Sequence, residues 1–160
     1  MKSRIYLICT VLLMTALFTG CDQTAKHNTL TEAEKAEGWE LLFDGHTLNG
    51  WRDYNGEELT APWFVEDGLI QAKGEGADEH GYIVTEKIYE NFELVWDWKI
   101  ADEGNSGVLY HVVENPKFKV PYVTGPEYQL IDDHGFPEPL EEWQRTASDY
   151  AMHTPDYSAI

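Results

Sequence analysis

Hydrophobic residues in this chain occur in short runs of β-branched and aromatic positions that are separated by turn residues. The clearest run is 91–100, where Phe92, Leu94, Trp96 and Trp98 alternate with mostly polar residues. Such alternation is typical of a strand with one face buried. The pattern predicts an all-β sandwich or barrel, with further strands at 40–43, 63–66, 69–72, 82–85, 107–113 and 127–132.

Turn and capping residues add two local predictions. Asp67-Gly68 separates two of the predicted strands, and this dipeptide tolerates the positive φ angles of a type I′ hairpin turn. Thr31 and Glu34 have the spacing of a capping box, and Gly38 suits a helix stop. We therefore expect a hairpin at 63–72 and a short helix at about 32–37.

The last third of the chain carries weaker signals. Leu140, Trp143 and Ala147 have helical spacing, which predicts a short helix over the sandwich. Residues 157–160 are largely apolar and resemble the opening of another strand. An antiparallel sandwich that stopped there would expose a sheet edge, so we expect residues 31–160 to be part of a longer domain.

The first residues predict an export signal. Residues 1–4 form a short basic segment that carries Lys2 and Arg4, and the apolar run 5–18 is too short to span a membrane. Phe18-Thr19-Gly20-Cys21 resembles the lipobox of bacterial lipoproteins, whose Cys carries a lipid. We expect a signal peptide at 1–20, lipidation at Cys21, a flexible tether at 21–30 and a lipid-anchored place in the bacterial cell envelope. The alternative is a plain secretory signal with a chance Cys.

Charge narrows the choice of partners. Removal of the signal leaves 9 Lys+Arg against 29 Asp+Glu, so 9 − 29 gives a net charge of −20. Nucleic-acid binding is excluded because phosphate contacts need clustered basic residues. The negative charge is compatible with neutral ligands such as sugars and with bound cations.

Several polar residues lie within the predicted strands among apolar neighbours. These residues are Asp97, Lys99, His111, Glu127 and Gln129. If the strands are adjacent, the five side chains collect on one sheet face, and a polar face rimmed by aromatic residues suits a sugar. The alternative is a solvated face with an ion pair among Asp97, Lys99 and Glu127.

A set of segments, in this order and spacing, resembles the 3-keto-disaccharide hydrolase domain family. The resemblance implies a concanavalin-A-like jelly roll of two antiparallel sheets and carbohydrate processing in an envelope or secreted setting. Family members commonly have Arg where His111 stands, and their domains continue past a point like Ile160. The matching segments are 30–39, 42–51, 63–70, 92–100, 105–111 and 127–132.

The resemblance also implies a reaction. A 3-keto group acidifies the C2 proton of a sugar, so a base can remove it and the glycosidic oxygen can leave, after which water adds. Glu127 or His111 is the expected base, and Asp97 is a catalytic orienter or metal ligand. A divalent metal ion polarising the ketone is a candidate cofactor, with His111, Glu127 and Asp97 as candidate ligands.

Three side chains are expected to position the sugar. Gln129 and Lys99 are the expected substrate-binding groups, with Asn105 as a further ligand contact. A lectin-like module that binds glycans without cleaving them would use the same fold and the same polar face. A purely structural envelope lipoprotein is a third reading, in which the polar face has no role.

Overall fold

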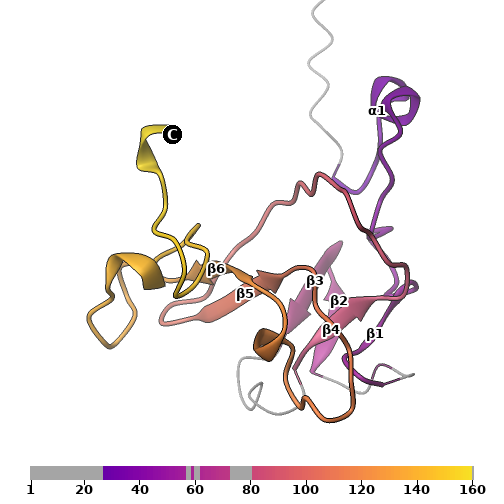
Figure 1. The fold of residues 1–160 in the computed structure, drawn as a ribbon. Helices are drawn as coiled ribbons and strands as arrows, with labels where there is room; N and C mark the ends of the chain where they lie inside the picture. The colour runs from indigo at the N-terminus through magenta and orange to yellow at the C-terminus, as the bar shows by residue number, and fades with distance from the viewer. Residues whose placement is uncertain (1–26, 57–58, 60–61, 73–80, 160) are drawn as a thin grey trace, which may run out of the picture.

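A computed structural model describes residues 27–56, 59, 62–72 and 81–159 (Figure 1). The predicted signal peptide, the lipidation of Cys21 and most of the tether lie outside the described residues. The helix is α1 (Glu32–Glu37), and three short 3-10 turns lie at Pro121–Val123, Glu142–Gln144 and Tyr157–Ala159. The strands are β1 (Trp51–Asp53), β2 (Trp63–Glu66), β3 (Leu69–Ala72), β4 (Ile83–Thr85), β5 (Asn105–Leu109) and β6 (Glu127–Ile131).

All strand pairing among these elements is antiparallel. β1 pairs with β4, β2 with β3, and β5 with β6 (Figure 1). The described chain has one helix of six residues. The predicted all-β class with antiparallel sheets is therefore confirmed.

The hairpin of β2 and β3 forms where the turn dipeptide predicts it. Asp67 has φ 52° and Gly68 has φ 74°, the positive values that a type I′ turn requires. Asn28 donates from Nδ2 to the carbonyl of Gly68 at 2.8 Å. Asn28 thus links the segment before α1 to the β2–β3 turn.

The predicted helix is confirmed as α1. The Thr31 side chain accepts from the Glu34 backbone N–H, while the Glu34 side chain accepts from the Thr31 backbone N–H. Gly38 ends the helix in the left-handed region, with φ 92°. Local capping alone accounts for this element, because none of its residues is buried.

The buried core of the described chain lies at β6. Leu130 and Ile131 are the buried large apolar residues of the described chain, and Gln129 beside them is buried too. β5 pairs with one edge of β6, and residues 146–150 bond to the other edge. β6 is therefore the central strand of a three-stranded arrangement.

A β-bulge sits on the outer edge of β6. Gln129 donates its N–H to the carbonyl of Ser148 and accepts from the N–H of Ala147, both at 3.0 Å, so two residues oppose one. Ala147 has φ 68°, the left-handed conformation that the first bulge position requires. The bulge places Ser148 against the centre of β6.

Residues 91–100 differ from their prediction. The segment joins β4 to β5 as an open arch and belongs to no strand of the described chain (Figure 1). The predicted alternation still holds at Trp96, whose ring faces inward. It packs edge-on against the Tyr128 ring, with the ring centroids 5.3 Å apart. No described strand lies beside its backbone to form a ladder, so the apolar pattern is present without strand pairing.

Other sequence predictions also fail in detail. Residues 40–43 form no strand, and the carbonyl of Leu42 instead accepts from the indole N–H of Trp51 at 2.6 Å. β5 ends at Leu109 rather than at 113, because His111 adopts φ 52°, which interrupts a strand. β6 ends at Ile131, one residue early.

The C-terminal predictions are wrong for local reasons. The helix expected over 140–147 is reduced to the 3-10 turn Glu142–Gln144, since Arg145 is extended at φ −78° and ψ 161°. The strand expected at 157–160 is a 3-10 turn over its described residues. No helix in the described part of the chain is long and apolar enough to cross a membrane.

Candidate functional site

Three of the predicted site residues share one face of the β5–β6 ribbon. In the register Asn105 opposes Ile131, and Gly107 opposes Gln129. Alternation along each strand puts Asn105, Gly107, Glu127 and Gln129 on the same side. Gln129 donates from Nε2 to Oδ1 of Asn105 at 3.2 Å. We call these four residues and Ser148 the polar face.

Glu127 lies across β5 where Gly107 has no side chain. A Cβ atom on Gly107 would overlap Oε1 of Glu127 and would lie 2.6 Å from both its Cδ and its Cγ. The carboxylate thus fills the space that a side chain at 107 would take. Glycine at this position is what allows the carboxylate to lie against the ribbon.

Burial against the ribbon also changes the acidity of this carboxyl. Desolvation raises the pKa of Glu127 above its ordinary value of 4.5, because the charged form loses water. β5 contributes no ionisable side chain. A carboxylate with a raised pKa is a stronger proton acceptor, which suits a general base.

Two polar atoms beside Glu127 are buried without a partner in the described chain. Gln129 is 2% exposed and its Oε1 accepts no hydrogen bond, while Ser148 is 0% exposed and its Oγ has none. Buried polar atoms are normally satisfied by protein, water or ligand. The polar face therefore has hydrogen-bonding capacity that the described residues do not use.

His111 lies apart from this face, just beyond the end of β5. Its exposed ring contacts Phe92, with centroids 5.8 Å apart, and Tyr110 at 5.7 Å. These three residues line a shallow hollow with Glu90 and Asn91.

Asp97 and Lys99 are not brought to the polar face. Both are exposed on the 91–100 segment. Asp97 leaves 92% of its side chain in solvent, and its Oδ2 lies 3.5 Å from Nδ1 of His27. Half of the six predicted site residues therefore converge, namely Asn105, Glu127 and Gln129.

The predicted metal ligands do not form a metal centre in the described chain. Its described residues contain no group of three or more His, Cys, Asp or Glu side chains arranged around one point. Glu127, His111 and Asp97 lie at three separate places. This donor set, as the described residues place it, does not fit a metal ion.

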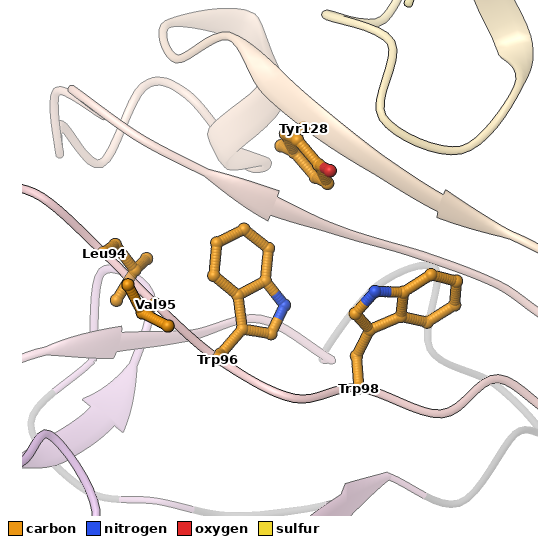
Figure 2. A pocket seen from close by; sticks show the side chains of 5 residues that line it. All are labelled: Leu94, Val95, Trp96, Trp98 and Tyr128. Atoms are coloured by element: carbon orange, nitrogen blue, oxygen red, sulfur yellow. The ribbon is translucent and has the colours of Figure 1, made fainter. Parts of the chain in front are cut away.

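An aromatic hollow lies on the other face of β6. Trp96 and Trp98 point from the 91–100 segment toward Tyr128, with Leu94 and Val95 beside them (Figure 2). Trp98 is 44% exposed. Tyr128 follows Glu127 in the strand, so this hollow and the polar face are on opposite sides.

Two polar-face residues went unrecognised as site residues in the sequence. β5 pairs regularly through Gly107, and the group that approaches this glycine closely is the side chain of Glu127. Ser148 reaches the face only through the bulge. A glycine two residues after Asn105 in a strand was a usable signal, whereas nothing local marked Ser148.

Comparison with known proteins matches this chain to one family. The family described as "3-keto-alpha-glucoside-1,2-lyase-like domain" matches residues 38–159. A curated relative, the 3-keto-disaccharide hydrolase of Bacteroides thetaiotaomicron, is 33% identical over 129 residues, which cover 72% of this chain and 44% of that protein.

A solved structure agrees with the family match. It comes from a protein of Parabacteroides distasonis provisionally named a glycosyl hydrolase, with 52% identity and a TM-score of 0.73. The similarity covers 81% of this chain and 60% of that one. This chain spans about half the length of these relatives. With the family matched over 38–159, the chain belongs to the 3-keto-alpha-glucoside-1,2-lyase-like domain family.

Proposed function

We propose that the protein containing this chain is a carbohydrate hydrolase that cleaves the glycosidic bond of 3-keto-disaccharides by elimination followed by hydration. The observation that carries the proposal is the Glu127 carboxylate, held against β5 with a raised pKa. The names of the family and of the curated relative supply the substrate class.

Elimination from a 3-keto-sugar starts with removal of the C2 proton, so it requires a general base rather than a pair of carboxylic acids. Glu127 takes the C2 proton, and the electrons of that C–H bond pass into an enolate with the 3-keto oxygen. The enolate then expels the C1 glycosidic oxygen, which receives the proton that Glu127 took and leaves as an alcohol. Water adds at C1 and a proton returns to C2, so the net reaction is hydrolysis.

Neighbouring groups fit the positioning role. Asn105 and Gln129 are tied to each other beside Glu127, and the free acceptor Oε1 of Gln129 suits a sugar hydroxyl donor. This arrangement differs from ordinary glycosidases, which need two carboxyl groups flanking the bond. Export and lipid anchoring through Cys21 belong to the same proposal, because they would place the protein at the cell envelope.

The test replaces Glu127 with Gln in the full-length protein. We expect E127Q to lower the turnover of a 3-keto-disaccharide by about 10²–10⁴-fold, the range for loss of a general base. The measurement is monosaccharide release from the keto-sugar and from its unoxidised parent. The matched control is E93Q, an exposed Glu on the 91–100 segment, which should keep wild-type turnover.

Two outcomes would change the assignment. Unchanged turnover in E127Q would remove Glu127 from catalysis. If the folded wild type binds oligosaccharides and turns over neither sugar, the lectin-like alternative is favoured. The exposed Trp98 ring in the aromatic hollow is the observation that supports this alternative, since an exposed ring can stack on a sugar face.

A further inference from the structure

The polar face holds one residue whose identity the proposed reaction does not explain, namely Gly107. Glycine in a strand interior weakens the strand, since it adds backbone entropy and packs no side chain. It is tolerated where the backbone needs a special conformation or where another group approaches closely. These two reasons can be separated at Gly107.

The backbone does not require glycine here. Gly107 is absent from the described glycines with positive φ, and it pairs regularly with Gln129 in the centre of β5. An L-residue could therefore adopt the same backbone without strain.

Close approach does require glycine. The three atoms that would lie nearest to a Cβ atom at position 107 all belong to Glu127, namely Oε1, Cδ and Cγ. A methyl group would push the carboxylate off the ribbon. By contrast, the backbone of β5 and β6 could stay in place, because no backbone atom is among these nearest three.

We propose that Gly107 is a positioning residue that holds the Glu127 carboxylate against β5 in the orientation needed to take the C2 proton of the substrate. The proposal rests on the proposed function for its catalytic consequence. The steric relation between the two residues stands without it.

Displacement of the carboxylate has a defined electrostatic consequence. The pKa of Glu127 is raised by burial alone, so a displaced side chain regains water and its pKa falls toward the ordinary value of 4.5. Charged neighbours offer no competing cause. β5 has no ionisable residue, Tyr150 lies across from Glu127 on the 146–150 edge, and Asp149 is on the opposite face with Tyr128.

The experiment compares G107A with the wild type in the full-length protein. We expect kcat for the keto-sugar to fall about 10²-fold with little change in KM, since binding groups stay and the base is misplaced. The acidic limb of the pH profile should move to lower pH. The pKa of Glu127, followed by carboxyl NMR, should fall as well. The matched control is S106A, on the same strand and the opposite face.

A double-mutant cycle keeps the test independent of activity and of partial unfolding. G107A should lower the Tm when Glu127 is present and should not lower it in an E127A background, because the overlap is then gone and alanine strengthens a strand that glycine weakens. A wild-type pKa for Glu127 in G107A, or equal Tm losses in both backgrounds, would overturn the proposal. If E127Q retains turnover, the proposed function fails, while the cycle still decides the steric relation.

Discussion

Glu127 carries a carboxylate, a group that normally stays in water, yet its side chain is half-buried on a sheet. Desolvation disfavours its charged form, so the folded protein binds a proton here more readily than the unfolded chain does. The stability contributed by protonation is present at low pH and is lost as pH rises through the raised pKa.

This sign gives a prediction for stability at the residue scale. E127Q removes the charge, so its Tm should exceed that of the wild type at pH 7. The two Tm values should meet as pH falls well below the ordinary pKa of 4.5, where the wild-type carboxyl is protonated in both states. Thermal unfolding at several pH values measures the difference. A lower Tm for E127Q at pH 7 would show that the carboxylate stabilises the fold.

The sequence predicted the position of some candidate residues correctly and of others wrongly. Strand alternation correctly put Glu127 and Gln129 on one face, and Asn105 joins them through the register of β5. The same reasoning included Asp97 and Lys99, which lie on a segment that pairs with no described strand. Alternation tells which side a residue faces, and only pairing tells what lies next to it.

Elements set by local chemistry formed where they were predicted. The hairpin between β2 and β3 needs only positive φ at Asp67 and Gly68, and α1 needs only its caps. The bulge at Ala147 is different, since it depends on β6 as a partner. There a non-glycine residue occupies the left-handed region because the bonds of Gln129 hold it.

The bulge yields a prediction at the element scale. A147V should lower the free energy of unfolding by about 1–3 kcal/mol, because a β-branched residue is strongly disfavoured at positive φ. Urea unfolding measures the loss. The control A72V places the same change in the exposed end of β3 and should cost little. If the two variants were equally stable, the conformation of Ala147 would not matter.

At the scale of the whole molecule, one ion pair joins segments far apart in sequence. Arg52 of β1 forms a bidentate ion pair with Glu114, which lies 62 positions later. Its Nη1 donates to Oε1 at 2.7 Å and its Nη2 donates to Oε2 at 2.5 Å. The guanidinium lowers the pKa of the Glu114 carboxyl, and the carboxylate raises the pKa of Arg52. The loop after β5 is thereby fastened to the β1–β4 ribbon.

The 91–100 segment shows a mismatch between pattern and pairing. Phe92 and Trp98 are 46% and 44% exposed, Val95 is 71% exposed, and Nε1 of Trp96 is buried without a partner among the described residues. The relatives are roughly twice as long as the matched region. We therefore expect this segment to become a paired strand in a protein that carries the additional length.

Hydrogen exchange tests this expectation. Amides of 92–100 should exchange freely in the 160-residue chain and should be protected at least 10²-fold in the longer protein, since paired strand amides open only with the sheet. Amides of β6 should be protected in both proteins and serve as the control. Equal, unprotected exchange of 92–100 in the longer protein would argue that the segment stays unpaired.

Sequence alone determined the features that arise from nearest neighbours: the all-β class, the turn at Asp67-Gly68, the caps of α1 and the facing of Glu127 and Gln129. These follow from φ preferences and from the period of two in a strand. The tertiary structure decided which other residues these features contact. It placed Glu127 over Gly107, brought Ser148 in through a bulge and left Asp97 in solvent, because such contacts depend on which strands pair, and no local pattern encodes that.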